Sequence, residues 1–283
     1  MRVDTYLPLL TICRPYATSA VDAVIPMPFR RCAALAIALA AAWPTRAGER
    51  RELVVFAAAS LRESFGQIAK AFEYGHPGVV VSLALAGSQE LRTQIENGAS
   101  ADVFASADAR HMEPLVAAKL AASAHVFARN EPVIVVPRGN PAGVSSLREL
   151  PRAKRIVLGI PAVPIGAYAL RILDAASNRY GPDFRARVEA RVVSREVNVR
   201  QVLAKVALGE ADAAIVYRTD VATAAGVEAI AIPPELNVVA KYPIAVLTSA
   251  GQPALARDFV DLVLSPGGQE ILGRCGFRPG NGA

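Results

Sequence analysis

Apolar residues along this chain form short continuous runs that alternate with stretches of helical spacing. Residues 53–59 are seven apolar residues in a row, which is typical of a strand buried on both faces. Leu61, Phe65, Ile68 and Phe72 follow at intervals that predict an amphipathic helix. Further strands are expected at residues 79–86, 103–105, 133–136, 156–159, 213–217 and 242–247. Further helices are expected after Ser88, around Tyr168 to Leu173, from Asn198, and at residues 254–264 and 269–273.

This alternation of strands and helices predicts an α/β fold in which mostly parallel sheets are flanked by helices. The residues after position 47 are too many for one such sheet and suit two lobes of roughly 120 residues each. No Gly/Ser-rich linker separates the lobes, so strands near 133–136 and 242–247 are candidates for the crossings. We expect residues 48–130 and 243–283 to form the first lobe and residues 131–242 the second.

The stretch before residue 48 has the order of features found in a secretory signal peptide. Met27 to Arg31 is short and basic, residues 32–43 are apolar, and the segment ends in the small residue Ala47. A buried Ala-rich helix is the alternative interpretation. The apolar run is only about half of the ~20 residues that cross a bilayer. We expect translation to start at Met27, cleavage after Ala47 and export to the periplasm.

Composition then narrows the class of partner. The chain is 53% hydrophobic and 20% charged, which excludes a disordered chain. The net charge is +6, but residues 1–47 hold five Arg and two Asp, so their removal lowers it to +3. No block of Lys and Arg stands out, and we expect no nucleic-acid partner. Of the three cysteines only Cys275 would remain, which excludes an intrachain disulfide.

The common catalytic signatures are missing from the sequence. It contains no G-x-S-x-G, Walker A, H-E-x-x-H or C-x-x-C motif, and no G-x-G-x-x-G follows the first strand. His76, His111 and His125 are interpreted as surface residues, since no set of ligands has the spacing of a metal site. We therefore expect a binding protein that is not an enzyme, with no catalytic residue, no cofactor and no metal held directly by side chains.

What recurs instead is a strand followed by a small or hydroxyl residue that opens a helix. This occurs at Ser60, at Gly87-Ser88, at Pro164-Ile165-Gly166 and at Asn198-Val199. The carboxyl ends of parallel strands lie on one edge of a sheet, where ligands bind. Helix N-termini present unpaired N–H groups and a partial positive charge. Several of them together would bind an anion with no Lys or Arg in contact.

Each junction also has an ordinary structural interpretation. Ser60 and Glu63 have the spacing of a capping box, and Ser88 is an ordinary helix N-cap. Pro164 is a typical first residue of a helix. Tyr217, at a strand end, is more often a packed tyrosine with a satisfied hydroxyl. The number of such junctions, together with the lack of catalytic signatures, therefore indicates a binding site.

From Glu52 to Phe277 the chain resembles the periplasmic molybdate-binding proteins of ABC importers. The segments that carry the resemblance are residues 55–61, 87–88, 94–104, 163–169, 199–200, 215–217 and 242–246.

The resemblance implies a two-lobed periplasmic-binding-protein fold with a molybdate or tungstate oxyanion closed in the cleft. It implies that Ser60 and Ser88 contribute side-chain hydroxyls from the first lobe. Ile165 and Val199 would contribute backbone N–H groups, and Tyr217 its hydroxyl, from the second lobe. It also implies a membrane permease as the partner, and we expect the receptor to be a monomer.

Three alternatives remain open. The first is a receptor of the same fold for sulfate or another oxyanion. The second is an enzyme with Ser60 as nucleophile, although no histidine lies in the loops expected to converge there. The third is the effector-binding half of a transcription regulator, which would need a helix-turn-helix module where the export signal lies.

Overall fold

The computed structural model of the protein describes residues 51–280. The expected start at Met27, the signal peptide and the cleavage after Ala47 lie outside these residues. Within residues 51–280, no helix combines the length and the apolar character needed to cross a membrane.

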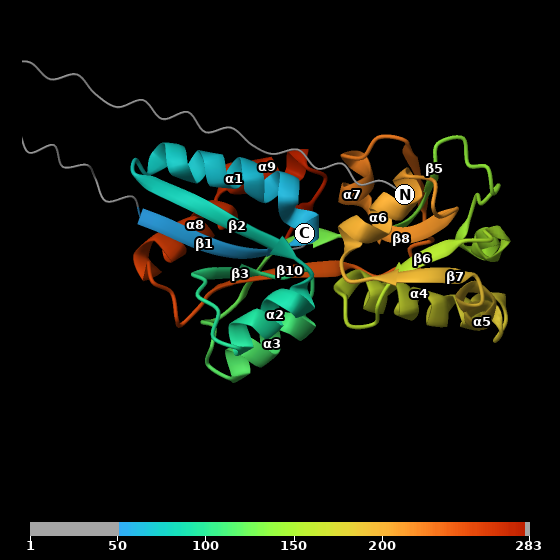
Figure 1. Ribbon diagram of the computed structural model, residues 1–283, viewed down its shortest axis with the longest axis horizontal. Coiled ribbons are helices and arrows are strands. Elements are labelled where there is room, and N and C mark those ends of the chain that lie inside the picture. The colour runs from blue at the N-terminus through green and yellow to red at the C-terminus, as the bar shows by residue number, and fades with distance from the viewer. Residues whose placement is uncertain (1–50, 281–283) are drawn as a thin grey trace, which may run out of the picture. The chain divides into compact units, whose positions relative to one another are not determined.

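Two β-sheets form the framework, and helices cover both faces of each (Figure 1). The first sheet consists of β1 Arg51–Ala58, β2 Val79–Ala86, β3 Val103–Ala105, β4 His125–Asn130, β10 Ala240–Val246 and β11 Arg278–Pro279. The second consists of β5 Pro132–Pro137, β6 Ile156–Gly159, β7 Val192–Glu196, β8 Ala213–Tyr217 and β9 Val227–Ala231. Their strand orders are β11-β4-β10-β3-β1-β2 and β7-β6-β8-β5-β9.

Helices pack on the sheets in two layers per lobe. On the first sheet, α1, α8 and α9 lie on one face and α2 and α3 on the other; on the second, α4 and α5 lie opposite α6 and α7 (Figure 1). Their bounds are α1 Arg62–Gly75, α2 Ser88–Glu96, α3 Ala109–Ala117, α4 Pro164–Tyr180, α5 Phe184–Glu189, α6 Val199–Ala207, α7 Arg218–Ala222, α8 Pro253–Leu264 and α9 Pro266–Arg274. Short 3-10 helices occupy η1 Ala59–Leu61 and η2 Leu147–Arg152.

The predicted α/β class with two lobes is confirmed, but each sheet is mixed. β1 runs parallel to β2 and β3, and β6 runs parallel to β7 and β8. The antiparallel pairs involve β10, β4 and β11 in the first sheet and β5 and β9 in the second. Two parallel strands of one sheet must be joined by a crossover connection such as a helix. No helix precedes β5 or β10 where the chain crosses between the lobes, and both strands pair antiparallel.

The chain passes between the sheets twice. It leaves β4 at Asn130 and enters β5 at Pro132, and it returns through residues 232–239 to β10. Ala240, the first residue of β10, already pairs with Asn130 in the first sheet. The boundary expected at residue 242 therefore falls inside β10.

Buried aromatic side chains pack α1 and α8 of the first lobe together. Phe65 of α1 lies 5.6 Å from Phe127 and 6.0 Å from Phe259, measured between ring centroids. Phe259 also packs edge-on against Phe72 at 5.4 Å. These four side chains are buried, so α1 and α8 are held against the strands whose ends carry the site described next.

Candidate functional site

A small cavity lies where the carboxyl ends of strands from both sheets meet. The cavity offers about 20 Å³ to the centre of a water molecule. On this measure a cavity needs about 10–15 Å³ to hold one water molecule. The space therefore suits a ligand of a few atoms. The cavity is lined by Ala58, Ala59, Ser60, Ala86, Gly87, Ser88, Ala107, Val163, Pro164, Ile165, Asn198, Val199 and Tyr217. All five residues that the sequence singled out are in this lining.

Ser60 lies in the 3-10 turn between β1 and α1 and is buried. The predicted capping box is wrong, because α1 begins at Arg62 with Leu61 as its N-cap and no side chain caps it. The Ser60 Oγ lies 3.0 Å from the hydroxyl of Tyr242 instead. Glu63, the other half of the expected box, pairs with Arg200 of the second lobe.

Ser88 is the first residue of α2, and the N-cap position expected for it belongs to Gly87. The Gly87 N–H donates to the Glu90 carboxylate at 3.2 Å. The Ser88 Oγ accepts a hydrogen bond from the backbone N–H of Ala107 at 3.0 Å. Because this oxygen already accepts, its own proton is available to a ligand in the cavity.

Two helix N-termini supply backbone donors. Ile165 is the second residue of α4, after Pro164, and Val199 is the first residue of α6. The first N–H groups of a helix have no partner within the helix. The Asn198 side chain caps α6 by accepting from the N–H of Gln201 at 3.1 Å, which leaves the Val199 N–H unused by the cap. Both helix ends can therefore stabilise negative charge.

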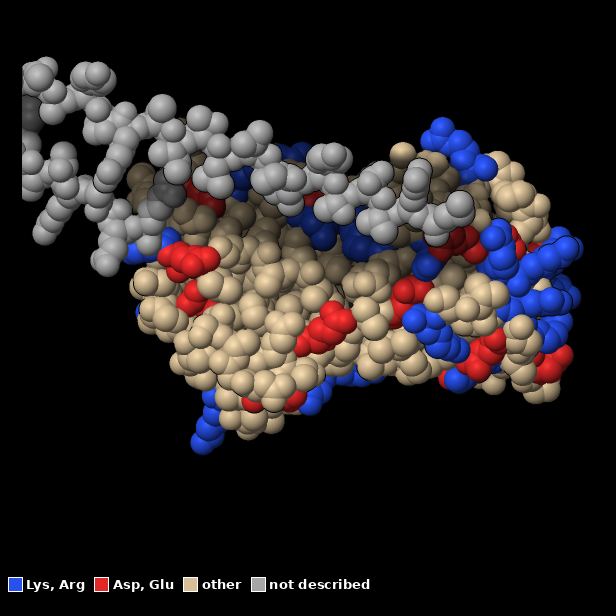
Figure 2. Space-filling view, viewed as in Figure 1, with Lys and Arg blue, Asp and Glu red and all other residues tan. Residues whose placement is uncertain are grey.

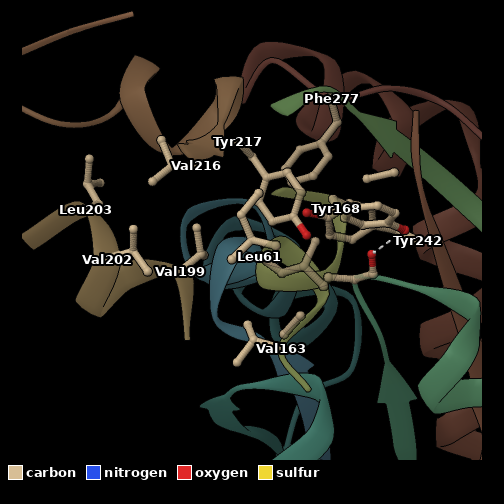
Figure 3. Packing of buried hydrophobic residues seen from close by; sticks show 14 of the residues in the cluster. Leu61, Val163, Tyr168, Val199, Val202, Leu203, Val216, Tyr217, Tyr242 and Phe277 are labelled. Atoms are coloured by element: carbon tan, nitrogen blue, oxygen red, sulfur yellow. Dashed lines mark hydrogen bonds between the residues drawn. The ribbon is translucent and has the colours of Figure 1, made fainter. Parts of the chain in front are cut away.

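Tyr217, the last residue of β8, brings a hydroxyl that has no partner among the described residues. Its side chain is 1% exposed, and its ring packs edge-on between Tyr168 and Tyr242 at centroid distances of 6.4 and 5.8 Å (Figure 3). A buried hydroxyl without a partner costs about 1–3 kcal/mol. Burial raises the pKa of Tyr217 well above its usual range, so the phenol stays protonated and can donate.

No charged side chain lines the cavity. Arg and Lys side chains gather instead near α5, at the other end of the second lobe (Figure 2). The arginines there line a separate groove and are Arg148, Arg152, Arg187 and Arg191. Any anion in the cavity must therefore be held by neutral hydrogen-bond donors.

Asp220 is a buried acid beside Tyr217 that was not predicted from the sequence. Its carboxylate accepts from the backbone N–H of Tyr217 at 3.2 Å. The Arg200 Nε lies 3.5 Å from its other oxygen. Burial raises the pKa of Asp220 to about 7, against the opposing effect of Arg200. Asp220 lies three residues after Tyr217, in the first turn of α7, and the sequence gives no signal there beyond an ordinary acidic residue in the first turn of a helix.

Hydrogen bonds join the two lobes around the cavity. Arg200 of α6 donates to the Ala59 carbonyl oxygen at 3.3 Å. The Gln89 Nε2 donates to the Val197 carbonyl oxygen at 2.7 Å. A Cβ on Gly87 would lie 2.5 Å from that same carbonyl oxygen, so only glycine permits this approach. The lobes are thus closed against each other at the mouth of the cavity.

His111 corrects an expectation from the sequence. It is 7% exposed rather than a surface residue, and its Nε2 lies 2.9 Å from the Ala162 carbonyl oxygen of the other lobe. A carbonyl only accepts, so this nitrogen carries the proton. Burial lowers the pKa of His111, which keeps the ring neutral. The spacing of His111 and Leu115 on one face of α3 was the signal that could have predicted burial.

The other two histidines differ from each other. His125 is exposed, as expected, and His76 is partly buried and stacks on Phe72 at 4.0 Å. Among residues 51–280, no group of three or more His, Cys, Asp or Glu is arranged to hold a metal ion.

The sequence of this chain is similar to those of known proteins. Residues 53–278 match the family model of the bacterial extracellular solute-binding proteins. The chain is 41% identical over 264 residues to the molybdate-binding protein ModA of Mycobacterium tuberculosis, covering 92% of this chain and 97% of that one.

Two solved structures have a similar fold. The substrate-binding domain of a putative molybdenum ABC transporter from Clostridium difficile has a TM-score of 0.61 at 26% identity, covering 81% of this chain and 98% of that chain. The sulfate-binding protein SubI from Mycobacterium tuberculosis has a TM-score of 0.73 at 20% identity, with 81% and 87% covered. The chain belongs to the bacterial extracellular solute-binding protein family.

Proposed function

We propose that this protein is a periplasmic receptor that binds molybdate, and also tungstate, and delivers the oxyanion to the permease of an ABC importer. One observation carries the proposal: hydroxyl and backbone donors from both lobes converge on one small cavity whose lining has no charged side chain. The 41% identity to a molybdate-binding protein over nearly its whole length supports the same ligand.

The ligand is inferred from the donors. Ser60, Ser88 and Tyr217 offer hydroxyl protons, and Ile165 and Val199 offer backbone N–H groups. Molybdate and tungstate are fully deprotonated at neutral pH and present only acceptors. Each donor would form a charge-assisted hydrogen bond, which is about twice as strong as a neutral one. A doubly charged tetrahedral oxyanion therefore matches the cavity in size and in hydrogen-bonding character.

The proposed delivery to a permease depends on closure of the two lobes around the anion. Donors on both lobes mean that a bound anion stabilises the closed arrangement over an open one. The contacts of Arg200 and Gln89 across the lobes would add to that preference. A permease could then distinguish the loaded receptor from the empty one by the relative position of its lobes.

A serine enzyme is disfavoured by the partner of Ser60. A nucleophilic serine needs a base that removes its proton. The side-chain partner of Ser60 is the Tyr242 hydroxyl, and burial raises the pKa of that tyrosine well above its usual range. Tyr242 is therefore a donor and a very poor base at neutral pH.

Isothermal calorimetry of the purified protein against molybdate, tungstate, sulfate and phosphate tests the proposal. We expect molybdate and tungstate to bind at least tenfold more tightly than sulfate or phosphate. Tighter binding of sulfate would make the protein a sulfate receptor. Absence of binding to all four, or labelling of Ser60 by a serine-reactive phosphonate, would contradict the proposed function.

A further inference from the structure

Tyr242 belongs to a segment that the sequence analysis singled out but to which it gave no role. In the structure its side chain is fully buried, and it does not line the cavity. Its hydroxyl lies behind the site, 3.0 Å from the Ser60 Oγ. The distance alone leaves open which of the two oxygens donates.

Asn130 decides the direction of this hydrogen bond. The Asn130 Oδ1 accepts from the backbone N–H of Glu131 at 2.9 Å, which fixes the orientation of the amide. Its Nδ2 therefore points the other way, to the Thr219 Oγ1 at 2.8 Å and the Tyr242 hydroxyl oxygen at 3.5 Å. An amide NH₂ group can only donate. The Tyr242 oxygen therefore accepts from Asn130. Among the described residues the other partner of this hydroxyl is the Ser60 Oγ, so the Tyr242 proton can form a hydrogen bond there by pointing to Ser60.

We infer that Tyr242, oriented by Asn130, is a positioning residue that donates to the Ser60 Oγ and thereby leaves the Ser60 proton to be donated into the cavity. The inference rests on the proposed function, because it concerns how Ser60 meets an anion. Among the described residues, Ser60 Oγ has no other side-chain or backbone hydrogen-bond partner.

The arrangement at Ser88 is equivalent but is built differently. There the backbone N–H of Ala107 donates to the serine oxygen, so that proton is also left for the ligand. Both serines are therefore prepared as donors before an anion arrives, one by the backbone and one by the Asn130–Tyr242 pair. An anion without a proton can accept hydrogen bonds from both serine hydroxyls. A protonated anion also needs an acceptor for its own proton, which these two serines do not offer.

The packing of Tyr242 makes its hydroxyl removable without loss of the ring. The ring packs edge-on against Phe127, Tyr217 and Phe277 at centroid distances of 6.3, 5.8 and 5.4 Å. Tyr242→Phe keeps these contacts and deletes the donor to Ser60, together with the long 3.5 Å hydrogen bond from Asn130. We expect this variant to bind molybdate about 3- to 10-fold more weakly, the loss of one net hydrogen bond.

A double-mutant cycle separates positioning from general damage. Molybdate affinity is measured for the wild type, Ser60→Ala, Tyr242→Phe and the double variant. If Tyr242 acts through Ser60, Tyr242→Phe changes affinity less than twofold in the Ser60→Ala background. An equal loss in both backgrounds would overturn the inference. Tyr180→Phe, away from the cavity lining, is the matched control and should leave affinity unchanged.

Selectivity provides a second readout that a purely structural role would not move. Without Tyr242's proton, Ser60 can turn to accept as well as donate, so the preference for molybdate over phosphate should narrow several-fold. A parallel loss of affinity for both anions would contradict the inference. Asn130→Asp, which replaces the donor by an acceptor, should weaken molybdate binding at least as much as Tyr242→Phe; wild-type affinity would overturn the assigned direction.

The outcomes distinguish the two proposals. Wild-type molybdate affinity in a folded Ser60→Ala variant would refute the assigned binding site itself. Weakened binding in Ser60→Ala together with unchanged binding in Tyr242→Phe would refute only the role of Tyr242. Circular dichroism and apo-state melting of each variant establish that it is folded.

Discussion

Arg200 of the second lobe pairs with Glu63 of the first, and the same guanidinium donates to the carbonyl oxygen of Ala59. Ala59 precedes Ser60, and Arg200 follows Val199, so this pair joins the two chain segments that carry proposed ligand donors. The contacts of Arg200 join the two lobes, so they stabilise the closed arrangement. A ligand bound by donors from both lobes stabilises the same arrangement. Closure and ligand binding are therefore coupled through this pair.

Glu63→Gln should weaken closure without removing any ligand donor. The pair is partly exposed, at 21% for Arg200 and 33% for Glu63, so its contribution is about 1 kcal/mol or less. We expect molybdate affinity to fall by up to about fivefold, with a larger effect at low salt. Glu210→Gln, which removes a pair with Lys205 inside the second lobe, is the control. Equal affinities in the two variants would show that the Arg200 pair does not contribute to closure.

Tyr217→Phe should separate binding from stability. Its hydroxyl is buried and has no hydrogen-bond partner among the described residues, so its removal breaks no hydrogen bond within this part of the protein and should leave the free energy of unfolding unchanged or raise it. With ligand, the variant loses a charge-assisted hydrogen bond of roughly 1.5–3 kcal/mol, which corresponds to about 10- to 150-fold in affinity. Urea unfolding and calorimetry measure the two effects. Lower apo stability with unchanged affinity would mean that the hydroxyl is structural.

Phosphate should compete poorly with molybdate. At neutral pH phosphate carries at least one proton, which needs an acceptor in the cavity. The oxygens of Ser60 and Ser88 already lie against Tyr242 and the Ala107 N–H, so they are poor acceptors for it. A buried O–H without a partner costs about 1–3 kcal/mol, and phosphate should bind at least about tenfold more weakly than molybdate. Competition titrations at constant ionic strength measure this ratio, and a ratio near one would require an acid in the site.

Asp220 should make the stability of the ligand-free protein depend on pH. Burial raises its pKa from 3.8 to about 7, so the folded protein holds a proton that the unfolded chain releases. The stability that this group provides is complete below about pH 4 and is lost as the pH rises through about 7. Asp220→Asn removes this loss. Relative to wild type, we expect the variant to gain about 2–3 kcal/mol in free energy of unfolding between pH 5 and 8.

Asp212→Asn is the control for this measurement. Burial opposes ionisation of Asp212, but hydrogen bonds and the charge of Arg155 lower its pKa overall. It stays ionised in both states between pH 5 and 8, so the difference between this variant and wild type should not change in that range. A pH-independent difference for Asp220→Asn as well would show that Asp220 is not protonated in the folded protein.

Local patterns in the sequence predicted the elements that are buried and regular. The run at residues 53–59 became β1, and the spacing of Phe65, Ile68 and Phe72 became α1. The elements that escaped prediction include β7 and β9, whose sequences VVSRE and VEAIA mix apolar and charged residues. Both strands lie at an edge of the second sheet, where half-exposed positions remove the continuous apolar signal. The order of strands in either sheet was likewise invisible, because pairing joins residues far apart in the chain.

The sequence by itself indicated that helices follow the strands near Ser60, Ser88, Ile165 and Val199, because helix starts depend largely on neighbouring residues, but it misplaced the start of α1 and the N-cap of α2. Local sequence could therefore indicate the junctions at Ser60, Ser88, Ile165 and Val199, and the family resemblance gave these residues and Tyr217 their roles as donors. Only the tertiary structure decided which way the hydroxyl protons point. Ser60 and Tyr242 are separated by 182 residues, and the buried positions of His111 and Asp220 depend on the same long-range packing. Desolvation and hydrogen-bond direction are properties of a folded environment, so they follow from neighbours in space that the order of residues does not reveal.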